Sequence, residues 1–180
     1  MRRLLFALAL FLAPPATAQD YRAPPTVSVQ RESDGGGVAR ASMDIAAPPE
    51  AVFIVLSDCA HAQRYMPELI SCRVLERGPG WELREHRVRG WLLRPVLRNV
   101  ARVDLEPNHR LSFRRVEGDW TRSDGEWRLT PIDGGRGTHV TYTVAAAVRG
   151  GAPDWLTVSR LRALVRRTLV RLRHEAQRAG

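Results

Sequence analysis

The sequence predicts an α+β fold made of an antiparallel β-meander, two short helices and one long C-terminal helix. Two observations support this class. Between residues 70 and 148, strand-like stretches follow one another with only turn signals between them, and connections this short join antiparallel strands. From residue 154 onward, apolar residues recur every three or four positions, which is the period of an amphipathic helix.

Turns rich in glycine and proline divide the strand-like part of the chain. Residues 27–32 and 38–45 flank a triple glycine, and they form either a β-hairpin or one long strand with a bulged break. In the last strand, Val140, Tyr142 and Val144 share one face. Six strands are expected after the short helices, over 72–77, 81–89, 96–105, 110–116, 125–130 and 138–148.

The helices are expected on both sides of this meander. Pro48-Pro49-Glu50 marks a helix start, because proline suits the first helical turn, and this helix is expected to end near Ser57. A second short helix is expected over 61–65. Arginines fill most of the polar face of the C-terminal helix, and its apolar stripe comprises Trp155, Val158, Leu161, Leu164, Val165, Leu169, Leu172 and Ala176.

The N-terminus has the pattern of a secretory signal peptide. Arg2 and Arg3 precede an apolar run over 4–13, and the cleavage motif Ala-Thr-Ala follows over 16–18. The run is shorter than the roughly 20 residues that span a bilayer, although an uncleaved anchor is the alternative. We therefore expect a signal peptide over 1–18, a Pro-rich linker over 19–26 and one domain over 27–180. The bacterial protein would be periplasmic or secreted.

The chain has a formal net charge of +9, and its basic residues are all arginine. Uniform use of arginine is more typical of a compositional habit than of nucleic-acid binding, and an exported protein is separated from nucleic acid. No nucleic acid is therefore expected as a partner. Positive charge is concentrated in the C-terminal helix, which favours an anionic membrane surface as a partner for that helix.

Cys59 and Cys72 are the only cysteines in the sequence. In an oxidising compartment they can form a disulfide that closes a short loop. The alternative is two small buried residues, because the sequence does not show whether their Cβ atoms meet.

Several short motifs carry a family resemblance. Residues 45–53 (IAAPPEAVF) with 56–58 (LSD) look like a first-helix signature, and 64–67 (RYMP) looks like the aromatic-proline turn that follows it. Residues 118–120 (GDW) and 125–129 (GEWRL) look like a strand pair. These motifs resemble the polyketide cyclase/dehydrase and coenzyme Q-binding START families of the START-like (SRPBCC) superfamily.

The resemblance covers about residues 38–175 and implies the helix-grip fold. In that fold a curved antiparallel sheet wraps around the C-terminal helix and leaves an elongated apolar cavity. It therefore implies a protein that binds a hydrophobic small molecule, such as a lipid, an isoprenoid or a polyketide-like compound, as a carrier or sensor. The motifs are specific for the fold and weak for function.

No motif predicts catalytic residues, a metal site or a cofactor. The five histidines form no pair at metal-ligand spacing, and no nucleophile elbow, P-loop or dinucleotide fingerprint is present. An alternative is a cyclase or dehydratase that acts on an aromatic or polyketide-like substrate in the same cavity, with Glu85, His86 and Arg115 to test first. A third hypothesis is a protein that binds a lipid surface or a partner and whose cavity is filled by side chains.

The residues expected to line the cavity are mostly aromatic, although each aromatic residue alone fits an ordinary core equally well. They are Tyr65, His86, Trp91, Arg115, Trp120, Trp127, Tyr142 and Trp155.

Two segments leave their orientation open. Polar residues occupy both faces of 82–87, so at least one of Arg84, Glu85, His86 and Arg87 is expected to point inward and recognise a polar group of a ligand. The alternative is an edge strand with solvated charges. The apolar segment 90–97 either touches a membrane or covers the cavity.

Overall fold

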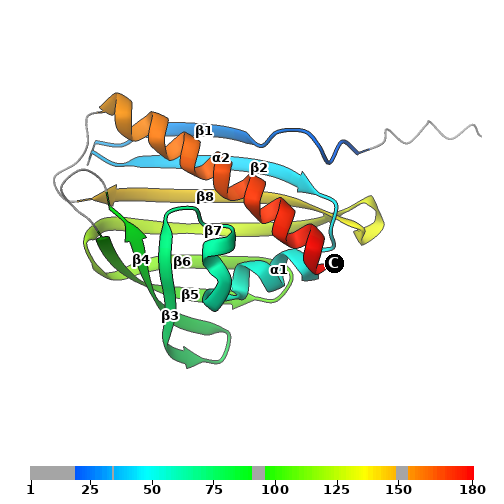
Figure 1. Ribbon diagram of the computed structural model, residues 1–180, viewed down its shortest axis with the longest axis horizontal. Coiled ribbons are helices and arrows are strands. Elements are labelled where there is room, and N and C mark those ends of the chain that lie inside the picture. The colour runs from blue at the N-terminus through cyan, green and yellow to red at the C-terminus, as the bar shows by residue number, and fades with distance from the viewer. Residues whose placement is uncertain (1–18, 34, 91–95, 149–153) are drawn as a thin grey trace, which may run out of the picture.

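The computed structural model describes residues 19–33, 35–90, 96–148 and 154–180, and these form one eight-stranded antiparallel sheet with helices on one side (Figure 1). The sheet order is β1-β2-β8-β7-β6-β5-β4-β3, so β2 and β8 are the neighbours that are distant in sequence. The strands are β1 (Thr26–Arg31), β2 (Gly37–Ile45), β3 (Leu69–Gly78), β4 (Trp81–Arg89), β5 (Val96–Glu106), β6 (Arg110–Gly118), β7 (Trp120–Ile132) and β8 (Gly137–Val148).

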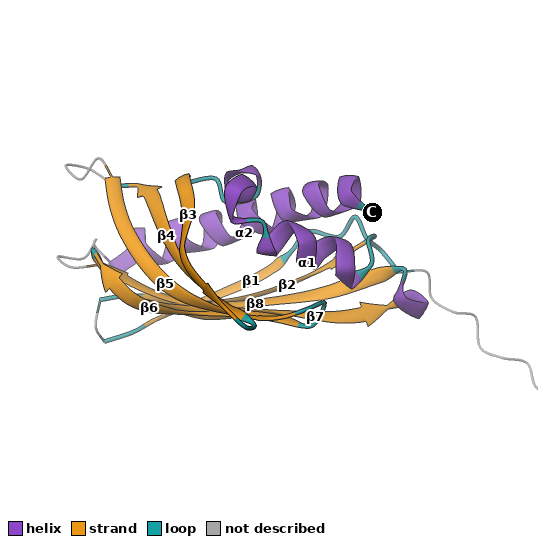
Figure 2. Cartoon of the chain, turned by 90° about the horizontal axis from the view of Figure 1, so that it is seen from below, coloured by secondary structure: helices purple, strands orange, loops and turns teal. Residues whose placement is uncertain are grey.

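The helices lie on the concave face of the sheet (Figure 2). They are α1 (Pro49–Ser57), α2 (Asp154–Ala179) and the 3₁₀ segment η1 (Cys59–Arg64), and a second 3₁₀ segment, η2 (Asp133–Gly135), joins β7 to β8. Helix α2 packs against α1, β1 and β2. This arrangement confirms the predicted helix-grip fold.

Local chemistry explains where the short helices begin and end. Proline occupies the first turn of α1 at Pro49, and the N–H of Asp58 closes its last turn by donating to the carbonyl of Ile54 at 3.1 Å. The Asp58 carboxylate then accepts a hydrogen bond from the His61 N–H at 3.2 Å, which caps η1. The second helix is therefore a 3₁₀ segment that starts two residues earlier than the expected 61–65.

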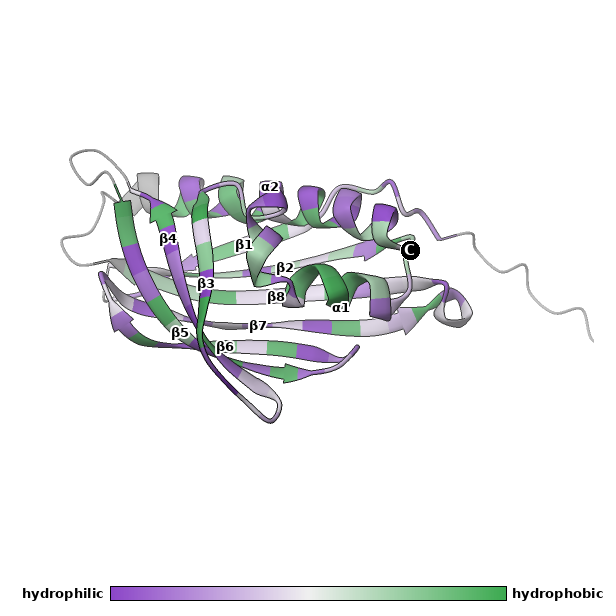
Figure 3. Ribbon diagram, turned by 60° about the horizontal axis from the view of Figure 1, so that its bottom comes forward, coloured by the Kyte–Doolittle hydropathy of each residue, from purple (hydrophilic) through white to green (hydrophobic). Residues whose placement is uncertain are grey.

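The core fills only one end of the space between helices and sheet. The largest fully buried side chains include Ile45, Val52, Leu56, Val140, Leu169 and Leu172. They place the C-terminal half of α2 against α1 and the centre of the sheet. Apolar and polar residues alternate along the strands, as a sheet with one covered face requires (Figure 3).

Several sequence expectations are resolved or corrected here. β1 and β2 form a hairpin, with Thr26 opposite Ser42, and not one bulged strand. β7 begins at Trp120, earlier than the predicted 125–130, because the turn before it is tight. At that turn Gly118 has a φ of 118°, and a Cβ there would lie 2.3 Å from the Arg98 carbonyl oxygen, so only glycine fits.

The N-terminal segment packs on the domain more closely than its proline content suggested. Pro25 is buried, and the Tyr21 hydroxyl donates to the Asp133 carboxylate at 3.3 Å. The signal peptide expected over 1–18 lies outside the described residues. No helix in the described ranges is long and apolar enough to cross a membrane.

Candidate ligand-binding cavity

The sheet and the N-terminal half of α2 enclose a cavity of about 670 Å³. This volume lies within the range of about 300–1,000 Å³ that is typical of small-molecule sites. The hypothesis that side chains fill the cavity is therefore wrong. Its apolar wall comprises Leu56, Met66, Leu69, Val88, Leu97, Ala101, Leu111, Phe113, Val144, Ala146, Ala147, Leu161, Leu164 and Val165.

Aromatic side chains form the floor of the cavity on β6, β7 and β8. The Trp127 indole, which is 5% exposed, stacks on the Tyr142 ring with the ring centroids 3.7 Å apart and an interplanar angle of 9°. The Phe113 ring lies 6.5 Å from the Tyr142 ring, centroid to centroid. Burial raises the pKa of the Tyr142 hydroxyl, so this ring is uncharged at any physiological pH.

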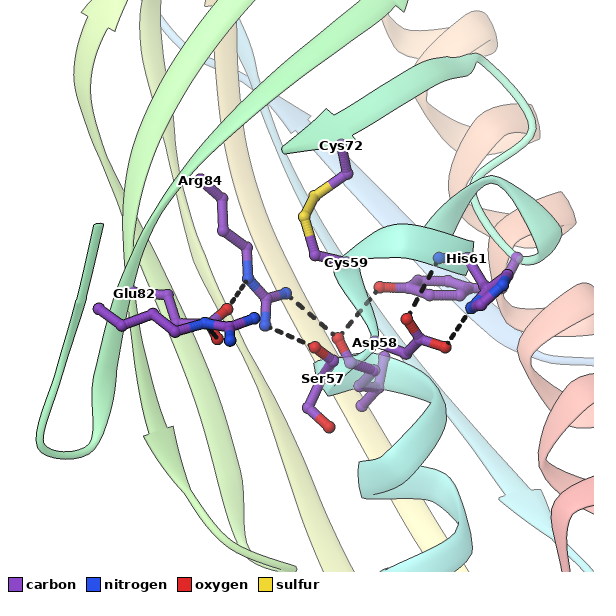
Figure 4. Close-up of a disulfide and its surroundings, with 10 residues drawn as sticks. Ser57, Asp58, Cys59, His61, Cys72, Glu82 and Arg84 are labelled. Carbon is purple, nitrogen blue, oxygen red and sulfur yellow. Dashed lines mark hydrogen bonds and ion pairs between the residues drawn. A yellow bond between two sulfur atoms is a disulfide. The ribbon is translucent and has the colours of Figure 1, made fainter. Parts of the chain in front are cut away.

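A buried arginine closes one end of the cavity beneath α1 (Figure 4). Arg84 on β4 is 3% exposed, and its guanidinium donates to the Glu82 carboxylate at 2.7 Å. The same group donates to the carbonyls of Ser57 at 2.7 Å and Leu56 at 3.4 Å, which lie at the C-terminal end of α1. A cation is favourable there, because the last carbonyls of a helix lack partners and carry partial negative charge.

A disulfide fixes the same corner from the other side. It joins Cys59 of η1 to Cys72 of β3, with their Cα atoms 5.4 Å apart (Figure 4). Next along the chain, the Tyr65 hydroxyl donates to the Leu56 carbonyl at 3.4 Å, and burial raises the pKa of this tyrosine to about 12. The disulfide, Arg84 and Tyr65 thus hold η1 and the end of α1 against the sheet.

Polar side chains interrupt the apolar wall at His86, Asn99 and Ser123. His86 on β4 lies opposite Asn99 on β5, and the Asn99 amide nitrogen donates to the Ser123 hydroxyl of β7 at 3.2 Å. The amide can reach past β6 because the β6 residue opposite Asn99 is Gly118, which has no side chain. Burial, together with the charge of Arg84, lowers the pKa of His86 to about 4, so its ring is neutral near pH 7.

Five of the eight residues predicted to line the cavity do so, namely Tyr65, His86, Trp120, Trp127 and Tyr142. Arg115 is not part of the wall, because its guanidinium folds back and donates to the Gly118 carbonyl at 3.1 Å. Trp91 and the side chain of Trp155 lie outside the described residues, as do residues 91–95 of the segment 90–97 that was expected to form a lid or a membrane contact.

Strand β4 carries both inward and outward polar groups. Arg84 and His86 line the cavity, whereas Glu85 accepts hydrogen bonds on the other face, from Arg98 at 2.6 Å. The edge-strand alternative is wrong, because β4 lies between β3 and β5. Glu85, His86 and Arg115 therefore do not converge in one site.

Sequence reasoning missed Asn99 and Ser123. Asn99 carried a usable signal, because it interrupts the inward series Leu97, Ala101, Val103 of one strand. Ser123 gave none, since it falls in a stretch that looked like the end of a turn. In the described ranges, no three His, Cys, Asp or Glu side chains are grouped so that they could hold a metal ion.

A family model described as polyketide cyclase / dehydrase and lipid transport matches residues 45–173. A comparison with curated proteins gave no match. Solved structures that share this fold include a STAR-related lipid transfer protein from Xanthomonas axonopodis (TM-score 0.73, 19% identity, covering 90% of this chain and 97% of that one).

Two other similar structures are a lipid transfer domain and an aromatase/cyclase. One is the human StarD13 lipid transfer and protein localization domain, with a TM-score of 0.72 and 16% identity over 88% of this chain and 87% of that one. The other is the Zhui aromatase/cyclase from Streptomyces sp. R1128, with a TM-score of 0.63 and 22% identity over 78% of this chain and 93% of that one. At these identities the likeness establishes the fold alone.

The disulfide gives a first prediction. Cys72→Ala should lower the free energy of unfolding by about 3 kcal/mol, because the bond closes a short loop in the unfolded chain. Urea unfolding of the oxidised protein and the variant measures this, and the wild-type protein under reductant is the matched control. Labelling of both thiols by iodoacetamide without prior reduction, followed by mass spectrometry, would contradict the bond.

His86 gives a second prediction. Its pKa is about 4 in the folded protein and about 6.5 in the unfolded chain. As the pH falls, His86 is therefore protonated in the unfolded chain before it is protonated in the folded protein. Stability should therefore fall as the pH drops from 6.5 toward 4, by up to about 3 kcal/mol. His86→Gln should remove this part of the urea-unfolding pH dependence, whereas His109→Gln, at an exposed histidine, should keep it. Identical profiles for the two variants would contradict a His86 that is half-buried and neutral near pH 7.

Proposed function

We propose that this chain, which belongs to the polyketide cyclase / dehydrase and lipid transport family, binds a hydrophobic small molecule in its cavity as a carrier or sensor. The observation that carries the proposal is the cavity of about 670 Å³, whose wall is mostly apolar and aromatic. An empty apolar cavity leaves its wall without packing contacts, so a ligand of matching polarity stabilises the protein. The ligand would be a lipid, an isoprenoid or a polyketide-like compound.

The START-like (SRPBCC) resemblance expected from the motifs is confirmed by the family match and by the similar START structures. Similar structures include both a lipid-transfer domain and an aromatase/cyclase, so family membership alone does not choose between carrying and catalysis. For this chain we favour binding of the ligand without a catalysed reaction. His86 reaches the cavity, but Glu85 and Arg115, the groups expected to work with it, do not line the wall.

We further propose that the protein is exported to the periplasm or beyond, with residues 1–18 acting as a cleaved signal peptide. The disulfide between Cys59 and Cys72 supports this proposal, because such bonds persist in oxidising compartments. N-terminal sequencing of the protein purified from its host tests the cleavage site after Ala18.

Filling the cavity tests the binding function. Ala146 on β8 lines the cavity, so Ala146→Phe should place a ring in the ligand space and weaken binding of the neutral probe N-phenyl-1-naphthylamine at least tenfold. Ala145→Phe, which adds the same ring at the next position outside the cavity wall, is the matched control. Fluorescence titration gives Kd, and native mass spectrometry of the wild-type protein detects any copurified ligand. Absence of probe binding to wild-type protein, or equal binding by both variants, would overturn the proposal.

Exposed arginines on α2 support a second part of the proposed function, which is contact with an anionic membrane surface while the ligand is loaded or released. Arg162 and Arg166 are exposed one turn apart and have no hydrogen-bond or ion-pair partner within the described ranges. Each arginine near an anionic surface contributes about 1 kcal/mol.

The membrane contact is tested by vesicle cosedimentation at low salt. Arg162→Gln with Arg166→Gln should weaken binding to phosphatidylglycerol-containing vesicles by at least tenfold. The control pair Arg87→Gln with Arg114→Gln removes the same charge from exposed arginines on the strands. Equal loss in both pairs would indicate attraction by net charge only, and no binding by wild-type protein would rule the contact out.

A further inference from the structure

Three polar side chains from three strands form a row on the cavity wall, here called the polar row: His86 of β4, Asn99 of β5 and Ser123 of β7. The row is continuous, because His86 and Asn99 are register partners and Asn99 is hydrogen-bonded to Ser123 at 3.2 Å. Asn99 is 5% exposed, whereas His86 and Ser123 are half-buried, so the middle of the row lies in the interior of the domain.

The polar row has hydrogen-bonding capacity that the described protein does not use. The side-chain oxygen of Asn99 is buried and has no hydrogen-bond partner within the described ranges. Within the described ranges, neither ring nitrogen of His86 has a hydrogen-bond partner. The Ser123 hydroxyl accepts a hydrogen bond from Asn99, and no described group accepts its own proton. Buried polar groups are nearly always hydrogen-bonded in native proteins, so a partner for the buried Asn99 oxygen is expected.

The electrostatics of the row exclude a charged partner. His86 is neutral near pH 7. Arg84, which lines the cavity two residues before His86 on β4, already binds Glu82 and two carbonyls of α1. Among the described residues, the other arginines that line the cavity, Arg89, Arg160 and Arg167, are exposed. A carboxylate or phosphate placed at the row would thus be removed from water without a free buried cation from the described part of the chain beside it, which is costly.

We infer that the polar row binds the uncharged hydroxyl group of an otherwise apolar ligand, an inference that rests on the proposed binding function. A hydroxyl both donates and accepts, so it can donate to the Asn99 oxygen while it accepts from His86 or Ser123. A ketone or ether oxygen only accepts and would leave the Asn99 oxygen unpaired. A hydrocarbon would leave both the Asn99 oxygen and the His86 ring without a partner. The ligand class is therefore a hydroxylated apolar molecule, such as a phenol or an alcohol, with any charged group confined to the exposed arginines.

Three probes of one shape test this inference: 1-hydroxypyrene, 1-methoxypyrene and pyrene, titrated by fluorescence at pH 7. The wild-type protein should bind 1-hydroxypyrene roughly three- to tenfold tighter than either of the others, which is the effect of one net hydrogen bond. Asn99→Leu should still bind pyrene but lose the preference for the hydroxyl. Thr168→Val, which removes a buried hydroxyl from the α2 side of the same cavity, is the matched control and should keep the preference.

The possible outcomes separate the inference from the proposed function. Equal binding of all three probes by wild-type protein would overturn the inference, with the row holding only water, while the binding function would stand. No binding of any probe would overturn both. Ser123→Ala serves as a second variant if Asn99→Leu does not fold, and it should reduce the preference. Retention of the full preference by every folded row variant would also overturn the assignment.

Discussion

The packing of the C-terminal half of α2 onto α1 and the sheet is the contact on which the rest of the structure depends. Leu169, Leu172 and Ala176 are fully buried there, and together with the buried residues of α1 and β8 they form the solid part of the core. A helix and a sheet are both continuous and stiff. Anchoring one end of α2 therefore sets the distance of its other end from the sheet, and the curvature of the sheet then leaves space beneath residues 160–168.

A cavity of this kind requires rigid walls, because apolar side chains would otherwise collapse into it. The corner formed by α1, η1, β3 and β4 supplies this rigidity through a disulfide and through the hydrogen bonds of a buried arginine. The disulfide between Cys59 and Cys72 restricts the chain covalently, and Arg84 binds the end of α1 by charge-assisted hydrogen bonds. Removing Arg84 would leave helix carbonyls and the Glu82 carboxylate without their partner. Loss of one member of a buried ion pair strongly lowers the stability of the folded state.

Polarity changes in order along the cavity. Arg84 and the end of α1 lie at one end, the Trp127–Tyr142 stack and the polar row lie along the wall, and exposed arginines from β4 and α2 lie toward the other end. Apart from Arg84, which is paired with Glu82, a ligand would therefore meet cations only where water can solvate them, and hydrogen-bonding groups where it is buried. This order makes polarity, more than volume, the property by which the cavity can select among apolar molecules of similar size.

The sequence by itself determined the α+β class, most strand positions, the long helix and the family, because alternation, helical spacing and turn residues are local properties of the chain. It also identified Trp127, Tyr142 and Tyr65 as cavity residues, since family motifs and strand alternation place them on the inner face. Only the tertiary structure decided the rest. β4 is an interior strand because β3 pairs with its outer edge. Arg115 does not line the cavity because its guanidinium donates to the Gly118 carbonyl. Asn99 is hydrogen-bonded to Ser123 because the intervening strand has a glycine at that position. Each of these depends on contacts between strands whose order and register no single stretch of sequence encodes.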